Sequence, residues 1–145
     1  MVTIFIPGEP KGKARARTFY DPQIQRHKSV TPERTVLYEN LIRELWLNES
    51  KGEFYDGDPL VVIITASFLP PKSASKRKKV EMLEGKIYPT KKPDIDNILK
   101  VVLDALNGLA YRDDSQVISC TVLKTYGEEE GVYVSLGKFE NYEKI

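Results

Sequence analysis

The stretch KKPDIDNILKVVLDALNGLAYRDDSQV, residues 91–117, holds five of the eight aspartates of the chain around one apolar helical pattern. Apolar residues recur in it at spacings of three and four, which predicts an amphipathic helix that ends near Asn107 and Gly108. These apolar positions are Ile95, Ile98, Leu99, Val102, Leu106 and Leu109. The pattern puts two aspartates at the start of the helix and two more beyond its end.

The aspartates at the helix start have an ordinary structural explanation. Pro93 favours an extended residue before it and suits a first helical turn, so Asp94 and Asp96 belong to the beginning of the helix. A carboxylate there stabilises a helix by about 1 kcal/mol, through hydrogen bonds to free N–H groups or through the macrodipole. Asp96, Lys100 and Asp104, spaced by four, are also compatible with a salt-bridge ladder on an exposed face. Both alternatives stay open.

The aspartates after the helix favour a functional explanation. A helix over residues 96–108 rises about 18 Å, and an extended return over residues 109–114 covers about 20 Å. We therefore expect Asp114 to lie beside the first helical turn, together with Asp94 and Asp96. Carboxylates gathered without enough cations are unfavourable unless a divalent cation lies among them. Oxygen ligands favour Mg²⁺ or Mn²⁺ over zinc, and the chain has no Cys/His cluster for zinc.

The net charge of +1 is the sum of acidic and basic segments. One basic segment alternates cations in the sequence KGKARAR, and the other is a lysine-rich run. Their members are Lys11, Lys13, Arg15 and Arg17 in the first, and Lys76, Arg77, Lys78 and Lys79 in the second. A basic run is usually a solvated surface, but two of them make phosphate binding an equally good explanation.

Length and composition predict one domain over residues 1–145. The chain is 41% hydrophobic and 30% charged, and it has no apolar run near the roughly 20 residues that a membrane span needs. The N-terminus has its apolar run before its basic residues, the reverse of a secretory signal, so we expect a cytoplasmic protein without a membrane partner. The lone Cys120 is expected to be a small core residue.

The remaining patterns predict an α+β fold with a mixed β-sheet flanked by two main α-helices. Residues 2–6 and the continuous apolar run at 59–70 are expected strands, the second in the sheet interior. A helix is expected from Pro32, with Thr31 as its N-cap, and a short helix in the lysine-rich run up to Gly85. Residues 117–126 and 132–139, joined by GEEEG, are expected to form a β-hairpin.

The aspartate-rich stretch also resembles the signature of the RusA family of Holliday junction resolvases. The matching parts are PDIDN, a lysine one turn later, DAL, and DDSQV; the early GEPKGKARAR is similar to the loop that many members carry after their first strand. The resemblance implies a RusA-like fold and a homodimeric endodeoxyribonuclease that resolves four-way DNA junctions. Such an enzyme makes paired symmetric phosphodiester cuts in DNA recombination and repair, with Mg²⁺ as cofactor and Mn²⁺ as a substitute.

The resemblance also implies roles for individual residues. The catalytic set that it implies is Asp94, Asp96, Lys100 and Asp114, with the three aspartates as metal ligands. Asn97 and Asp113 are either groups that support those ligands or ordinary capping and turn residues. Since an acidic site alone repels DNA, the two basic segments are expected to hold the DNA backbones, with an affinity that falls steeply with salt.

Two other functions remain as alternatives. One is a branched-DNA-binding protein without catalysis, in which the aspartates only cap a helix. The other is a metal-dependent nuclease that acts on forks or flaps.

Overall fold

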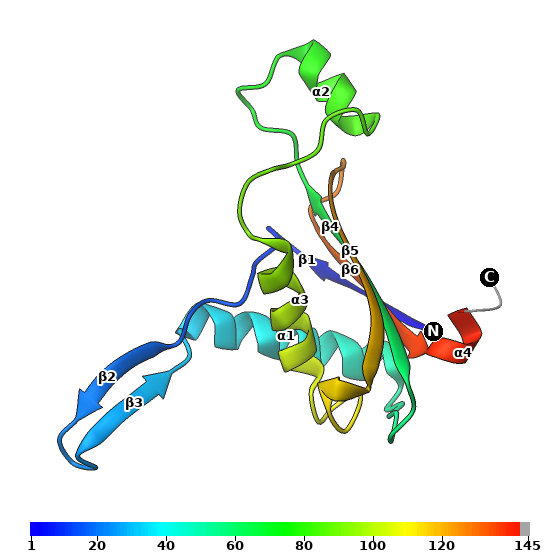
Figure 1. The fold of residues 1–145 in the computed structure, drawn as a ribbon. Helices are drawn as coiled ribbons and strands as arrows, with labels where there is room; N and C mark the ends of the chain where they lie inside the picture. The colour runs from blue at the N-terminus through cyan, green and yellow to red at the C-terminus, as the bar shows by residue number, and fades with distance from the viewer. Residues whose placement is uncertain (143–145) are drawn as a thin grey trace.

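The computed structural model describes residues 1–142, with side chains up to residue 140. The strands are β1 (Val2–Pro7), β2 (Arg17–Asp21), β3 (Arg26–Val30), β4 (Leu60–Phe68), β5 (Val117–Tyr126) and β6 (Gly131–Lys138). The helices are α1 (Glu33–Ser50), α2 (Lys76–Leu83), α3 (Ile95–Leu106), the short 3₁₀ helix η1 (Asp114–Gln116) and α4 (Phe139–Tyr142). The predicted α+β fold with a mixed sheet is confirmed (Figure 1).

The main sheet has the strand order β1-β6-β4-β5. β4 pairs antiparallel with β6 and parallel with β5, which confirms the predicted interior strand. The predicted hairpin of residues 117–126 and 132–139 is wrong, because β4 lies between these two strands. The physical reason is that β4 is predominantly apolar and takes the most buried position, whereas β5, with exposed residues such as Ile118 and Leu123, forms the sheet edge.

The connection from β5 to β6 crosses the end of β4 and is held there by hydrogen bonds. The N–H of Gly127 donates to the carbonyl of Phe68 over 2.9 Å. The hydroxyl of Ser67 donates to the carbonyl of Glu129 over 2.6 Å. The acidic GEEEG segment is therefore a crossover loop rather than a hairpin turn.

The core lies between the sheet and the two long helices, α1 and α3. α1 buries Tyr38, Ile42 and Trp46, and it contacts both β1 and α3. It begins one residue later than predicted, since Pro32 and not Thr31 takes the cap position. α3 ends at Leu106 with Asn107 as its cap, as predicted.

Two segments project from this body in different directions (Figure 1). β2 and β3 form an antiparallel hairpin in a region that was predicted to be only a basic loop. α2 confirms the predicted lysine-rich helix and stands on a lobe between β4 and α3. The start of α3 lies between the two projections.

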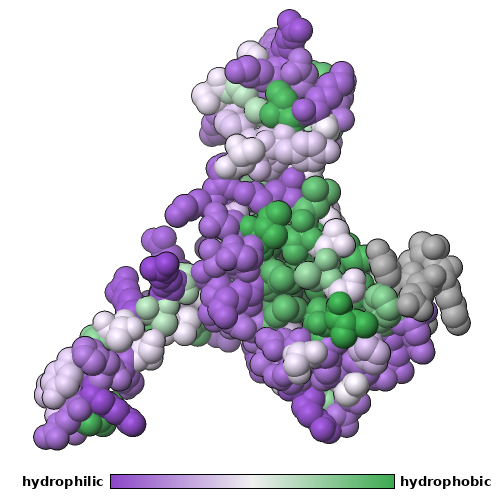
Figure 2. Space-filling view, in the orientation of Figure 1, coloured by the Kyte–Doolittle hydropathy of each residue, from purple (hydrophilic) through white to green (hydrophobic). Residues whose placement is uncertain are grey.

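The surface of the body differs from that of the projections. Figure 2 shows that both projections are largely hydrophilic, whereas an apolar area covers the body where α3 and β5 lie. Ile95 on α3 is 48% exposed and Ile118 on β5 is 58% exposed. Cys120 is exposed as well, so its prediction as a core residue is wrong; it lies on the edge strand. No described helix has the length and apolar character of a membrane span.

Candidate nuclease site at the start of α3

Asp94 occupies the N-cap position of α3, but its carboxylate makes no capping hydrogen bond. Elsewhere in the chain such positions are used in the ordinary way: the side chain of Ser75 accepts from the N–H of Lys78 over 3.2 Å, and that of Asp113 accepts from the N–H of Ser115 over 3.2 Å. Asp94 and Asp96 are both exposed. The capping explanation therefore fails for Asp94, whose carboxylate is free to bind a ligand.

The alternative of a salt-bridge ladder along α3 is also not formed. Asp104 pairs with Lys13 from another segment, over 3.3 Å. Among residues 1–140, neither Asp96 nor Lys100 forms an ion pair. Lys100 lies about one helical turn after Asp96 in α3, and both side chains are exposed. The first turn of α3 and the turn after it thus present two carboxylates and one ammonium group to solvent.

Asp114 does not lie with them. After α3 the chain makes a tight turn, in which the N–H of Ala110 donates to the carbonyl of Leu106 over 2.9 Å and the N–H of Gly108 donates to the carbonyl of Tyr111 over 2.8 Å. The predicted extended return is therefore wrong, and η1 begins at the C-terminal end of α3 (Figure 1). The 12 residues of α3 separate Asp114 from the helix start by about 18 Å.

This turn is locked in place by buried and bidentate contacts. The hydroxyl of Tyr111, a fully buried residue, donates to the carbonyl of Leu103 over 2.6 Å. The side-chain amide of Gln116 donates to the carbonyls of Tyr55 and Asp58, each over 3.1 Å. Asp114 is fixed by these contacts at the far end of the helix. Within residues 1–140, accordingly, no three His, Cys, Asp or Glu side chains form a metal-holding group.

The two candidate supporting residues have structural partners. Asp113 forms a capping box with Gln116 at the start of η1, and hydrogen bonds from Ser115 lower the pKa of its carboxyl group. The backbone carbonyl of Asn97 accepts from the N–H of Lys13 over 2.8 Å. The capping explanation for Asp113 is thereby confirmed, and Asn97 anchors the basic loop on α3.

Lys13 differs from the other predicted DNA-contacting cations. Its ammonium lies 2.6 Å from Glu39 and 3.3 Å from Asp104, and its side chain is only 17% exposed. Burial lowers the pKa of Lys13, but its hydrogen bonds to the two carboxylates outweigh burial and raise that pKa. Lys13 therefore fastens the basic loop to α1 and α3 and does not present a free charge to DNA.

Gly12 brings this loop against the start of α3. A Cβ atom at Gly12 would lie 2.8 Å from Cβ of Asn97 and 3.0 Å from Cβ of Pro93. Beside the contact lies a hollow, which Asp94 helps to line. The lining residues are Glu9, Gly12, Lys13, Lys92, Pro93, Asp94 and Asn97. The tight approach of the loop thus shapes the surroundings of Asp94.

The other predicted cations lie on the loop and on the projections. Lys11, Arg15, Arg17, Lys76, Arg77 and Lys78 are exposed, and Lys79 is half-buried. Arg77 also pairs with Glu81 within α2, over 3.4 Å. Because the projections lie on either side of the start of α3 (Figure 1), the acidic residues there are flanked by positive charge.

Sequence reasoning missed two cations that fasten the α2 lobe beside the site. The ammonium of Lys124 donates to the backbone carbonyl of Lys91. The ammonium groups of Lys91 and Lys124 lie 5.1 and 5.9 Å from the ring centre of Phe68, within the range of cation–π attraction. No short motif signals this arrangement, because its members come from the end of β4, the approach to α3 and β5.

Comparison with known proteins identifies the family of this chain. Residues 7–137 match the family described as Endodeoxyribonuclease RusA. The chain is also 52% identical over 68 residues to the protein YqaN of Bacillus subtilis (strain 168), a match that covers 46% of this chain and 48% of that relative. The chain thus spans about half the length of this relative. Since the family match covers nearly all of its residues, the chain belongs to the RusA endodeoxyribonuclease family.

Proposed function

We propose that this chain is a cytoplasmic, Mg²⁺-dependent endonuclease that resolves four-way DNA junctions by paired symmetric cuts and works as a homodimer. The observation that carries the proposal is the free carboxylate of Asp94, which stands beside Asp96 at a helix start without capping it. Membership of the RusA family supports the nuclease chemistry. The flanking positive projections supply the charge that DNA binding needs.

The donor set at the start of α3 suits a hard divalent cation. Asp94 and Asp96 offer oxygen ligands only, which Mg²⁺ prefers and Mn²⁺ accepts. A divalent cation bound there supplies an activated water and neutralises charge on the scissile phosphate. Lys100, one turn after Asp96, donates a hydrogen bond to a phosphate oxygen and offsets the negative charge that develops during cleavage.

The homodimer supplies the third carboxylate in this proposal. One chain keeps Asp114 a helix length away from Asp94 and Asp96. Two copies related by a two-fold axis, with their α3 helices antiparallel, would put Asp114 of each chain beside Asp94 and Asp96 of the other. Such an arrangement makes two equivalent sites, and a two-fold symmetric junction requires two cuts.

The exposed apolar residues of the body support this pairing. Ile95 on α3 and Ile118 on the edge strand β5 are large exposed apolar side chains, and α3 contacts β5. A free sheet edge also offers unpaired backbone groups to a second chain. Contact between copies on this face would bury both features.

DNA binding is assigned to the cations of the two projections, which are exposed except for the half-buried Lys79. Lys76, Arg77, Lys78 and Lys79 on the α2 lobe, and Lys11, Arg15 and Arg17 toward the hairpin, contact phosphates on either side of the acidic residues. Each phosphate contact releases counterions, so affinity falls steeply with salt. Lys13 is left out of this set because its charge is taken up by Glu39 and Asp104.

The test is cleavage of a synthetic four-way junction by the purified protein, with Mg²⁺ and with chelator, beside Asp96→Asn. We expect paired symmetric nicks that need Mg²⁺ and that the mutant does not make. Binding without nicks from either protein would instead identify a non-catalytic DNA-binding protein. Competition among junction, fork, flap and duplex substrates separates a junction resolvase from a fork or flap nuclease.

A further inference from the structure

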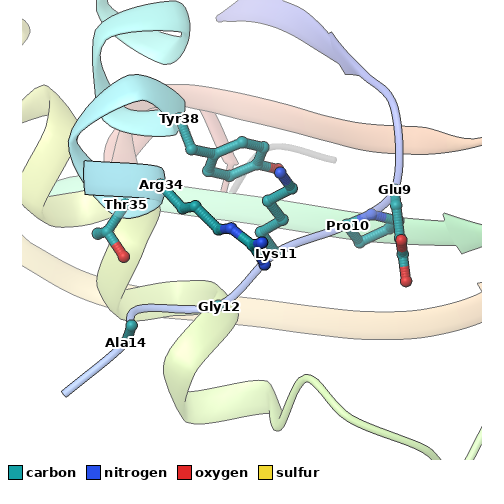
Figure 3. A pocket seen from close by; sticks show the side chains of 8 residues that line it. All are labelled: Glu9, Pro10, Lys11, Gly12, Ala14, Arg34, Thr35 and Tyr38. Carbon is teal, nitrogen blue, oxygen red and sulfur yellow. The ribbon is translucent and has the colours of Figure 1, made fainter. Parts of the chain in front are cut away.

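A second pocket lies across the basic loop from Asp94, between that loop and the first turns of α1 (Figure 3). It has a volume of about 300 Å³ and is lined by Glu9, Pro10, Lys11, Gly12, Ala14, Arg34, Thr35 and Tyr38. Glu9 and Gly12 also line the hollow at Asp94. Only the thickness of the loop therefore separates the two.

Two cations from different segments meet at this pocket. In Figure 3 the guanidinium of Arg34 extends from α1 toward the backbone of Lys11. Neither cation has an ion pair within residues 1–140, and both are exposed. Glu9 is the one acidic residue of the lining, and its carboxylate points away from the two cations at the far end of the pocket. Neighbouring cations that lack a carboxylate between them favour an anion as ligand.

The start of α1 adds further donors. This 18-residue helix has Pro32 at its cap position and no side-chain cap, and Glu33 in its first turn partly offsets its positive dipole end. Thr35 is only 4% exposed, and its hydroxyl points toward the backbone of Gly12 and Ala14. This hydroxyl has no hydrogen bond to any residue in the described part of the chain. The hydroxyl is not among the buried polar atoms without a partner in the described residues, so it is accessible from the pocket and can donate to a ligand there.

We propose that this pocket binds a phosphodiester group of the DNA strand that is cut. This group lies close to the scissile phosphate, which the proposed function places at the divalent cation of Asp94 and Asp96. Arg34 and Lys11 supply positive charge, and the hydroxyl of Thr35 donates a hydrogen bond to a phosphate oxygen. Because the loop alone separates the pockets, one strand passing over Gly12 reaches both. The proposal rests on the proposed function for the identity of the ligand as DNA.

The first test measures binding of a four-way junction in chelator, which prevents cleavage, over a series of salt concentrations. Arg34→Gln should weaken binding about three- to tenfold and reduce the slope of log affinity against log salt by about one. Thr35→Val keeps the side-chain volume and removes the donor, so it should weaken binding by a similar factor with the slope unchanged. Lys51→Gln, at the other end of α1, is the control and should bind like the wild type. Wild-type binding by both pocket variants would overturn the proposal.

The second test locates the phosphate. Junctions are made with a single neutral methylphosphonate at successive linkages around the cut. At one linkage, the methylphosphonate should weaken binding by the wild type but should not weaken binding by Arg34→Gln any further. The reason is that the neutral linkage and the Arg34→Gln change remove the same contact. Additive effects at every linkage would contradict the assignment.

A third experiment distinguishes binding of DNA from binding of a free anion in the pocket. The nicking assay distinguishes failure of this proposal from failure of the proposed nuclease function. Inorganic phosphate is titrated while NMR signals of Thr35 are followed; phosphate binding together with unchanged DNA affinity in both variants would assign the pocket to a free anion and overturn our proposal. Nicking of the junction by the wild type with Mg²⁺ tests the proposed function alone. Absence of nicks leaves the binding results in chelator fully interpretable.

Discussion

Nζ of Lys13 lies 2.6 Å from Oε1 of Glu39 in α1, and it also lies 3.3 Å from Oδ2 of Asp104 in α3. One ammonium group thus joins the basic loop to both long helices. Lys13→Met leaves two partly buried carboxylates without their cation, and we expect it to lower the free energy of unfolding by about 1–3 kcal/mol. Urea unfolding at pH 7 measures this. Arg15→Met, an exposed cation on the same loop, should change it by less than about 0.5 kcal/mol; equal effects of the two variants would contradict the structural role of Lys13.

Tyr38 predicts a loss of stability at alkaline pH. Burial raises the pKa of Tyr38 to about 12, although a hydrogen bond with the backbone of Lys11 partly opposes it. Because the folded pKa lies above the ordinary value of 10.0, this stabilisation is complete below pH 10 and is lost as the pH rises toward 12. The free energy of unfolding of wild type, minus that of Tyr38→Phe, should therefore decrease over this range. Other titrating groups occur in both proteins and cancel, so parallel pH curves would contradict the prediction.

The contact of Gly12 with α3 predicts sensitivity to a single methyl group. A Cβ at this position lies 2.8 Å from Cβ of Asn97, and these backbone-fixed atoms can separate only if the loop moves from the start of α3. We expect Gly12→Ala to lower the free energy of unfolding by about 1–3 kcal/mol and to reduce junction cleavage. Ala16→Val, at an exposed position of the same loop, is the control. If Gly12→Ala is as stable as the wild type and cleaves junctions equally well, the prediction is contradicted, because the loop can then relax the contact at little cost.

The apolar face of the body predicts where two copies meet. Ile118 is 58% exposed on the edge strand, so Ile118→Lys should leave the fold intact while it places a charge in the proposed dimer contact. Sedimentation should show a shift from dimer to monomer, with loss of junction cleavage. Leu47→Lys, at a position of α1 that is 49% exposed, should remain dimeric. A dimeric Ile118→Lys variant would place the contact on another surface.

The local elements of the fold were predictable, and their pairing was less so. The amphipathic pattern of α3, the apolar run of β4 and the lysine-rich α2 each depend on neighbours in sequence. The order of the strands does not: β4 separates β5 from β6 because burial favours its apolar side chains in the centre of the sheet. The β2–β3 hairpin was missed because its strands, with exposed residues such as Phe19 and Lys28, bury too little for an alternating pattern.

The candidate site was predictable as a set of residues but not as a geometry. Asp94, Asp96 and Lys100 lie where a helix pattern puts them, at one end of α3. The position of Asp114 depends on the turn held by Tyr111 and Gln116. The partners of these two residues lie in α3 and in the segment before β4, and no rule of sequence spacing predicts such contacts. Lys13 illustrates the same limit, because its two carboxylate partners come from distant parts of the sequence.

The acidic residues lie at opposite ends of α3 in one chain, and the central claim is that they meet across a dimer. This claim is tested most directly by mixing two inactive variants. Asp96→Asn and Asp114→Asn are each expected to be inactive on a four-way junction with Mg²⁺. If the carboxylates meet across a dimer, co-refolded mixed dimers contain one fully intact site and one doubly altered site, so the mixture should regain nicking of a single strand per junction. A mixture that stays inactive beside an active, co-refolded wild type would contradict a site shared between two chains.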